Sequence, residues 1–334
     1  MASVLPLHPY IDAELYQEER RAIFARSWQF FGLSADLSRP GDYLAETLAG
    51  FPLVVVRDAQ GKLHGFHNVC RHRGGPLVSE AKGRCDKDLV CRVHDWRFSF
   101  DGRLLAAPGI DIRSGMDVSG LGLYPIRVES WAGFLFVNLD KDAAPLADAL
   151  GNLNRETWTL ADRTARLRHS HPIACNWKIY AENHLSGYRI GGEFSTKTSS
   201  LDRGASQIKV SEGVLSDDAS GSKTTEEHHW AYIWPNLSFT LYRGVLLIEA
   251  IRPTGHERTE IDHIFLHAPE DPTVDAAMVA SEDVTHDNAW ACERIQKNFA
   301  AGVFQPAPPG LAPDLPSDWF RDRIHKSLSL GQSL

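Results

Sequence analysis

The sequence predicts an α+β chain in which a small all-β domain, at about residues 40–150, is inserted in a larger α+β domain. Three observations support this prediction. The length of 334 residues is generous for one hydrophobic core and suits two domains. Helical periodicity occurs before and after the central stretch but not inside it. From Tyr43 to about residue 135 the pattern is instead one of short apolar strands separated by turn residues.

Composition and charge exclude several classes of protein. Hydrophobic residues make up 43% and charged residues 23% of the chain, which is typical of a globular protein. The 35 Lys and Arg against 43 Asp and Glu give a net charge of −8, which argues against a general nucleic-acid binder. No apolar run approaches the roughly 18–20 residues of a membrane helix, and no secretory signal is visible. Five cysteines are too few for a disulfide scaffold. We therefore expect a cytoplasmic protein without membrane or nucleic-acid partners.

The elements follow from local patterns, taken in chain order. Residues 11–28 carry apolar side chains at helical spacing and predict an amphipathic helix. The segments FPLVVVRD and LHGFHNV flank the turn AQGK and predict a hairpin, and GFLFVN at Gly133–Asn138 predicts another strand. The remaining predictions are helices at 146–160, 176–189 and 282–300, and strands at 229–240, 244–252 and 261–268.

The strongest chemical signal lies in the β domain. Cys70 and His72 are separated by one residue, and Cys91 and His94 follow with two residues between them. Zinc sites use four such side chains, but their paired cysteines are usually two to four residues apart. Pairs that each mix one Cys with one His suit a two-iron cluster, in which one iron takes both thiolates and the other both imidazoles. Chance placement and zinc are the weaker interpretations.

With these residues in view, the chain resembles the α subunits of the Rieske non-haem iron, ring-hydroxylating oxygenases over nearly its whole length. The matching segments are EERRAIFARSW, Pro40-Gly41-Asp42-Tyr43, NVCRHRGGPL, LVCRVHDWRFSFDG, Asn176-Trp177-Lys178, Ala181-Glu182-Asn183 and CERIQ at Cys292–Gln296. The resemblance implies an all-β Rieske [2Fe–2S] domain at 40–150 and a larger, helix-grip-like catalytic domain with an antiparallel sheet at 151–334. The segment 1–39 should pack on the larger domain.

The loops also indicate which Rieske class the chain is similar to. Cytochrome-complex Rieske proteins join their loops by a disulfide and often place a Ser hydroxyl on the cluster, whereas this chain has Gly75, Val93 and Trp96 at the corresponding places. Fewer donors to the sulfurs predict a potential near the low end of the Rieske range, roughly −150 mV. Asp95 is a departure, because the family often has Gly there. Asp tolerates a left-handed backbone better than most residues.

The resemblance implies a second metal site whose ligands this sequence lacks. Family members bind a mononuclear iron with two His and one carboxylate. In register, the two His positions hold Arg189 and Phe194, the carboxylate position holds Asn288, and Ser186 replaces the carboxylate that links cluster and iron. Arg carries a positive charge and no free lone pair, so it does not bind a cation. The weak alternatives are Glu193 and Asp283. We expect the mononuclear Fe(II) to be absent.

Three functional hypotheses follow. The first is an electron-transfer component that receives electrons from a flavin reductase or ferredoxin. It would serve O2-dependent oxidation of a small organic, aromatic substrate beside an iron-competent α-type partner, in a trimer that can be hetero-oligomeric. The second is an active Rieske mono- or dioxygenase with unusual iron ligands. The third is a non-catalytic redox-sensing or structural homologue. No catalytic residue is assigned beyond the ligand positions.

Overall fold

The computed structural model describes residues 8–109, 117–160, 163–186, 208–218, 228–242, 244–305 and 315–331. These residues form two compact units. The smaller comprises residues 25–146, and the larger comprises the described parts of 1–24 and 147–334. None of the described helices is both long and apolar enough to span a membrane.

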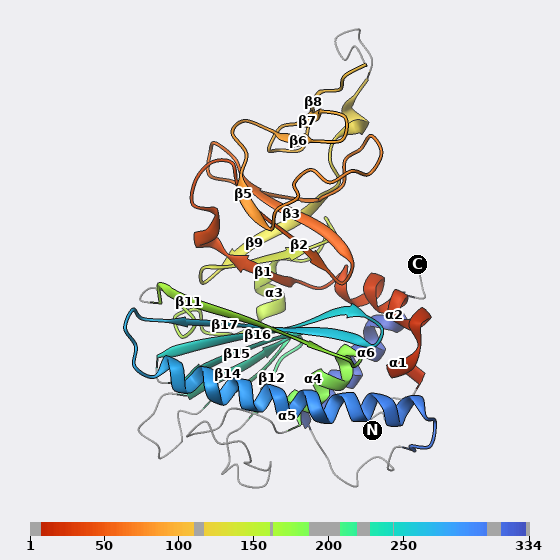
Figure 1. Cartoon of the computed structure of the whole chain (residues 1–334), viewed down its shortest axis with the longest axis vertical. Coiled ribbons are helices and arrows are strands. Elements are labelled where there is room, and N and C mark those ends of the chain that lie inside the picture. The colour runs from red at the N-terminus through yellow and green to blue at the C-terminus, as the bar shows by residue number, and fades with distance from the viewer. Residues whose placement is uncertain are drawn as a thin grey trace. The chain divides into compact units, whose positions relative to one another are not determined.

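The smaller unit is built of antiparallel strands (Figure 1). Its seven-stranded sheet has the order β1 (Gln29–Leu33), β10 (Phe134–Asn138), β9 (Pro125–Trp131), β4 (Leu63–His67), β3 (Phe51–Arg57), β2 (Asp42–Leu48) and β5 (Lys82–Arg84). A three-stranded sheet contains β6 (Leu89–Cys91), β7 (Trp96–Phe98) and β8 (Leu104–Ala106). The predicted hairpin is confirmed, because β3 and β4 pair antiparallel. Short 3₁₀ turns occupy Ser34–Leu37 and Ser119–Leu121.

The boundary of the smaller unit differs from the one placed at residue 40. Strand β1 pairs antiparallel with β10 and buries four of its five residues, so it is part of this sheet. Only residues up to 24 group with the larger unit. They form the helices α1 (His8–Ile11) and α2 (Ala13–Glu19), followed by a π-helical turn at Arg20–Phe24. The predicted helix 11–28 therefore ends before Trp28, where the chain turns into β1.

The larger unit contains a seven-stranded antiparallel sheet, and this part of the fold prediction is confirmed. The order is β11 (Ala165–Ile173), β17 (Arg258–His267), β16 (Val245–Gly255), β15 (Leu237–Tyr242), β14 (His228–Ile233), β13 (Val214–Asp218) and β12 (Ile208–Val210). Sequence reasoning missed β11, and it took residues 229–240 for one strand. They form the hairpin β14–β15, and its turn contains Pro235, which has no N–H for a sheet ladder.

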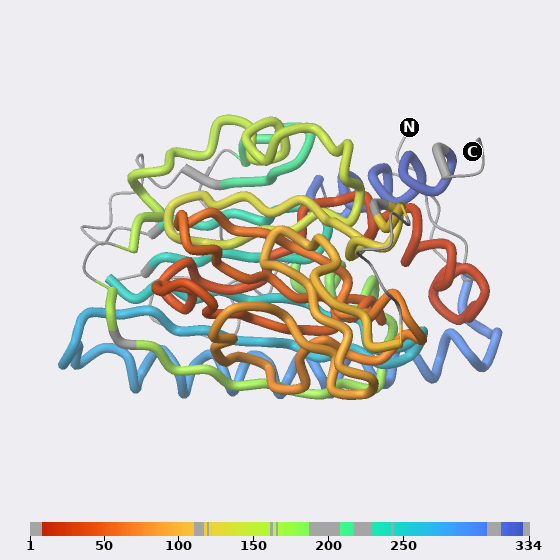
Figure 2. The backbone as a smooth tube through the Cα atoms, turned by 90° about the horizontal axis from the view of Figure 1, so that it is seen from above, coloured from red at the N-terminus to blue at the C-terminus, as the bar shows by residue number. Residues whose placement is uncertain are grey.

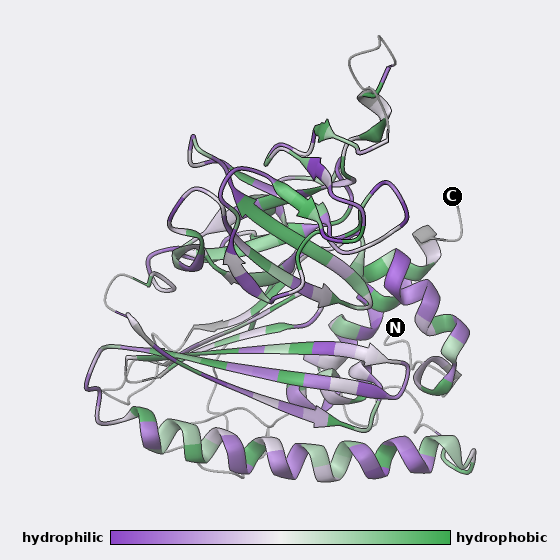
Figure 3. Ribbon diagram, turned by 45° about the horizontal axis from the view of Figure 1, so that its top comes forward, coloured by the Kyte–Doolittle hydropathy of each residue, from purple (hydrophilic) through white to green (hydrophobic). Residues whose placement is uncertain are grey.

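The helices of the larger unit are α3 (Leu146–Leu150), α4 (Trp177–Leu185), α5 (Val274–Ala300) and α6 (Leu315–Gly331). Helix α5 begins eight residues before the predicted start at 282, and α3 is shorter than predicted. Figure 2 shows α5 following the length of β17, and Figure 3 shows apolar and polar residues alternating along it. Val274 and Ala277 of α5 pack on Val245, Leu247 and Phe265 of the sheet. This amphipathic face explains why the helix lies on the sheet.

A buried ion pair attaches the N-terminal segment to this unit. Lys178 Nζ of α4 lies 2.6 Å from Glu19 Oε1 of α2, and both side chains have no solvent exposure. Glu19 Oε2 also accepts a 2.9 Å hydrogen bond from Trp177 Nε1, and Lys178 donates to Asn176 Oδ1 at 2.8 Å. Burial lowers the pKa of Lys178, although Glu19 opposes this shift. Neither charge has access to water, so each depends on the other.

We expect Lys178→Met to destabilise the larger unit by about 3–5 kcal/mol, because it leaves the Glu19 carboxylate buried without a cation. The double variant Glu19→Leu/Lys178→Met should regain most of this loss. Urea unfolding followed by hydrogen exchange in α4 measures both. Lys326→Met is the matched control, since Lys326 and Asp322 form an exposed pair, 69% and 56% accessible, which is worth at most about 1 kcal/mol. Equal losses in the two single variants would contradict the prediction.

Candidate functional site

The first of the two Cys/His loops joins β4 to β5 and contains Cys70 and His72. Asn68 holds this loop in shape. Its Oδ1 accepts hydrogen bonds from the N–H groups of Leu77 (2.8 Å) and Val78 (3.1 Å), and its Nδ2 donates to the carbonyl of Val78 at 2.8 Å. A single amide thus fixes the far end of the loop relative to its start.

The second loop is the turn between β6 and β7, with Cys91 on the last residue of β6 and His94 in the turn. The two loops are closed in the same way. In the first, the N–H of Gly74 donates to the carbonyl of Cys70 at 3.0 Å, and in the second, the N–H of Asp95 donates to the carbonyl of Cys91 at 2.9 Å. Each loop therefore presents a Cys and a His over a single backbone turn.

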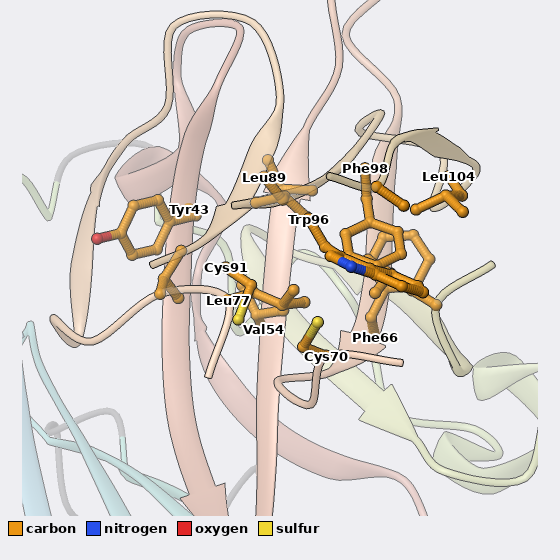
Figure 4. Close-up of a cluster of buried hydrophobic side chains, with 14 residues drawn as sticks. Tyr43, Val54, Phe66, Cys70, Leu77, Leu89, Cys91, Trp96, Phe98 and Leu104 are labelled. Atoms are coloured by element: carbon orange, nitrogen blue, oxygen red, sulfur yellow. The ribbon is translucent and has the colours of Figure 1, made fainter. Parts of the chain in front are cut away.

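The two thiols meet in the apolar core of the smaller unit. Cys70 is 3% and Cys91 2% exposed, and both belong to a core that includes Val54, Leu77 and Phe98. Figure 4 shows the two cysteines next to each other in this core. Burial raises the pKa of the Cys70 thiol, and the neighbouring Cys91 raises it further. Burying a free thiolate in this apolar core would be energetically unfavourable. A bound metal would offset the negative charge of the thiolate.

The two imidazoles also converge. The ring centroids of His72 and His94 are 4.5 Å apart with the planes at 79°, and His72 stacks on Trp96 at 4.9 Å with the planes nearly parallel. Burial lowers the pKa of His72, and His94 beside it adds to this shift. His72 Nδ1 is buried and has no hydrogen-bond partner within the described residues. A buried imidazole nitrogen without a hydrogen-bond partner is suited to bind a metal ion.

The two loops approach each other closely beside the thiol of Cys91. Gly75 passes so close to the second loop that an added Cβ would lie 2.7 Å from Val93 Cγ2 and 3.1 Å from Cys91 Sγ. Glycine is therefore required for the approach of the loops. Two buried thiols and two adjacent imidazoles, one of which has an unsatisfied nitrogen, are the ligand types of a Rieske [2Fe–2S] centre. Of the other cysteines, Cys175 and Cys292 are buried and Cys85 is half-buried.

The second metal site falls partly outside the described residues, which do not include Arg189, Glu193 or Phe194. Asn288 is buried on α5, and its Oδ1 accepts a 2.8 Å hydrogen bond from Asn183 Nδ2 of α4. Asp283, the alternative carboxylate, is exposed on the same helix. The hydroxyl of Ser186 donates to the carbonyl of Glu182 at 2.7 Å. Two of the positions that the resemblance assigns to carboxylates therefore hold a neutral amide and a hydroxyl.

A buried polar network that sequence reasoning missed lies beside these positions. Glu249 on β16 is 3.0 Å from His184 Nδ1 through one oxygen and 3.0 Å from His263 Nε2 through the other. The network continues from His184 to Ser238 at 3.2 Å and from His263 to Ser281 at 3.3 Å. The signal was present in the sequence, since Glu249 is a lone carboxylate in the apolar strand VLLIEAI.

Electrostatics explain why Glu249 is tolerated in the core. Burial by itself would raise the pKa of this carboxyl, but the imidazoles of His184 and His263 outweigh burial and hold the pKa well below its usual range. Two His and one carboxylate are the ligand types of a mononuclear iron site. They are arranged here as a chain, each imidazole on its own carboxylate oxygen. No group of three or more His, Cys, Asp or Glu side chains in the described ranges could hold one metal ion.

Two models of known protein families match the chain. Residues 27–115 match the model of the Rieske [2Fe-2S] domain, and residues 194–314 match that of the ring hydroxylating alpha subunit (catalytic domain). The chain belongs to the Rieske oxygenase α-subunit family. The first match contains all four Cys and His residues of the loops, and the second contains the position of Asn288.

Curated relatives are oxygenase subunits. The chain is 36% identical over 199 residues to the glycine betaine monooxygenase oxygenase subunit of Chromohalobacter salexigens, covering 59% of this chain and 44% of that protein. It is 32% identical over 186 residues to the carnitine monooxygenase oxygenase subunit of Acinetobacter baumannii, covering 54% and 50%. The match therefore spans about half the length of these relatives. The chloroplastic choline monooxygenase of Beta vulgaris is 26% identical over 317 residues, 89% of this chain and 70% of that one.

Solved structures share the fold. The quaternary ammonium Rieske monooxygenase CntA superposes with a TM-score of 0.78 at 21% identity, over 97% of this chain and 95% of that one. A naphthalene 1,2-dioxygenase mutant gives a TM-score of 0.71 at 22% identity, over 97% and 92%. At these identities the likeness concerns the fold of the Rieske oxygenases and not the details of the site.

We expect Gly75→Ala to reduce the iron and acid-labile sulfide bound per chain, because the new methyl group would press on Val93 and on Cys91 Sγ. Overpacking of this kind costs about 1–3 kcal/mol and would shift one loop against the other. Gly120→Ala is the control, since a Cβ there meets nothing within 4 Å. Equal cluster content in the two variants, measured by iron and sulfide assay with the visible spectrum, would show that the approach at Gly75 is not needed.

We expect Glu249→Gln to destabilise the larger unit by about 3 kcal/mol at neutral pH, since it removes the buried charge that both imidazoles face. The folded pKa of Glu249 is depressed. Its contribution is therefore fully present above the unfolded value of about 4.3 and is lost as the pH falls below it. The difference in free energy of unfolding between wild type and Glu249→Gln should thus decrease from pH 6 to pH 3, as measured by denaturant titrations. A difference in free energy of unfolding that increases as the pH falls would contradict this prediction.

Proposed function

We propose that this chain is an electron-delivering Rieske component of an oxygenase system. In this proposal Cys70 and Cys91 bind one iron of a [2Fe–2S] cluster, and His72 and His94 bind the other. The observation that carries the proposal is the contrast between the two sites. The Cys/His loops present a complete donor set with an orphaned nitrogen, while Asn288 and Ser186 supply no carboxylate.

When bound, the cluster would supply one-electron transfer at low potential. The protein's own residues would position the cluster and shield it from water. Asn68 and the two backbone turns fix the spacing of the ligands, and the apolar core around Cys70 and Cys91 keeps water from the sulfurs. Trp96 holds the plane of His72 through stacking. His94 is exposed, so its imidazole edge is the natural point at which an electron enters or leaves.

The expected absence of mononuclear iron is part of the proposal. A buried Asn288 whose oxygen already accepts from Asn183 is a poor substitute for a carboxylate, because it is neutral and engaged. Arg189 and Phe194 at the two His positions add a cation and an apolar ring. The residues do not fit this metal, so we derive no oxygen chemistry within the chain and place that chemistry in an iron-competent α-type subunit.

The relatives suggest the chemistry of the system. Rieske oxygenases receive electrons from a reductase or ferredoxin, and the oxygenase subunits above are named for glycine betaine, carnitine and choline. We therefore propose a quaternary ammonium compound as the substrate of the system, in place of the aromatic compound expected from the sequence. The structure of a quaternary ammonium Rieske monooxygenase is described as revealing insights into inter-subunit electron transfer. In the trimer that the resemblance implies, this chain would pass electrons to a neighbour.

A second candidate function is a self-sufficient monooxygenase for such a compound. The observation in its favour is the 32–36% identity to oxygenase subunits named as monooxygenases. It requires iron ligands other than those at the family positions. The metal content of the pure protein distinguishes the two candidates.

We expect the purified chain to contain about two irons and two labile sulfides, and to accept electrons from a reductase without oxidising a quaternary ammonium substrate by itself. Iron analysis, electron resonance and oxygen uptake measure this. A third, chelatable ferrous ion together with O2-dependent product from this chain alone would favour the second candidate.

The converse test restores the missing ligands. The triple variant Arg189→His/Phe194→His/Asn288→Asp should bind one further ferrous ion, since it supplies two imidazoles and a carboxylate. Arg189→His/Phe194→His alone is the matched control and should bind it more weakly. Failure of the triple variant to bind iron would mean that more than these three positions separates the chain from an iron-competent relative.

A further inference from the structure

The residue that closes each Cys/His loop has a left-handed backbone. Gly74 has a φ of +76° in the first loop, and Asp95 has a φ of +58° in the second. Both donate their N–H to the carbonyl of the cysteine four residues earlier. The two loops thus need the same conformation at the same place, and glycine meets this need in the first loop at no steric cost.

In the second loop the chain uses a residue for which this conformation is strained. A side chain at positive φ places Cβ close to the backbone, and Asp is tolerated there but not favoured. Glycine would close the turn equally well, as Gly74 does. The carboxylate of Asp95 is therefore not explained by the backbone. Strain at a residue next to a metal ligand points to a role for the side chain.

The surroundings of Asp95 indicate that role. It is exposed and directly follows His94, the exposed ligand of the proposed cluster. Within residues 70–74 and 91–95 the other charged residues are cations. Arg73 and Arg92 are exposed, and Arg71 lies over the ring of Tyr124 at 4.1 Å and donates to the carbonyl of Gly120 at 2.6 Å. Asp95 places a negative charge among these cations, beside the imidazole edge at which electrons would pass.

We propose that Asp95 is a positioning residue of electrostatic kind, whose fixed negative charge lowers the midpoint potential of the cluster and makes it a stronger electron donor. This rests on the proposed function, because it needs the cluster on His94. Reduction adds one electron to the cluster, and adding it beside a carboxylate is unfavourable. The effect adds to the shortage of hydrogen-bond donors at Gly75 and Val93, which already favours a low potential.

The test compares Asp95→Asn and Asp95→Gly with wild type by redox titration of the intact chain. Both variants remove the charge, while Asn keeps the side-chain shape and Gly removes the strain. We expect both to shift the reduction equilibrium with a one-electron mediator roughly three- to tenfold toward the reduced cluster, where tenfold equals 59 mV. The shift should shrink as salt is raised, since an exposed charge is screened. Asp142→Asn, which removes an exposed carboxylate after β10 in the same unit, should leave the potential unchanged.

The outcomes separate the two proposals. If the Rieske electron-resonance signal is present and neither variant changes the potential, or if Asp95→Gly alone changes it, Asp95 acts through the backbone and this inference is overturned. If the wild-type chain shows no Rieske signal, the proposed function itself fails. Asp95→Gly should also raise the melting temperature of the smaller unit, a readout that does not depend on electron transfer.

Discussion

A buried charge must have a partner, and helix α4 is where this constraint organises the larger unit. Over nine residues, α4 carries three ionisable side chains, of which Lys178 and His184 are buried and Glu182 is half-buried. Lys178 pairs with Glu19 of the N-terminal segment, Glu182 pairs with Arg321 of α6 at 2.5 Å, and His184 pairs with Glu249 of the sheet. Tyr10 also donates to Glu182. Three separate parts of the unit are thus held on one short helix, because unpaired charges would be too costly.

This arrangement fixes α4 relative to its neighbours. Asn183 of α4 faces Asn288 of α5, and a 2.8 Å amide hydrogen bond joins the two side chains. The Glu249 network lies next to it and uses two imidazoles to neutralise one carboxylate. The buried groups at these points therefore pair with one another across α4, α5 and the sheet.

In the smaller unit, a polar group is left unsatisfied where the cluster would bind. His72 Nδ1 is buried without a partner in the described part of the chain, and two thiols are buried side by side. The loops are nevertheless rigid, because Asn68 and the turns at Gly74 and Asp95 satisfy the backbone. A redox centre requires metal ligands that are held by rigid loops. When the ligands are fixed in position, they move little as the centre gains or loses an electron.

The sequence by itself determined the two-domain α+β class and the Cys/His pairs, because ligand spacing and strand periodicity are local properties of the chain. Only the tertiary structure decided that Asn288 of α5 faces inward while Asp283 is exposed, that β1 joins the smaller sheet, and that Glu249 lies between two histidines. These facts depend on contacts between residues far apart in sequence. His184 and His263 are 79 positions apart, and no local pattern records that one carboxylate joins them.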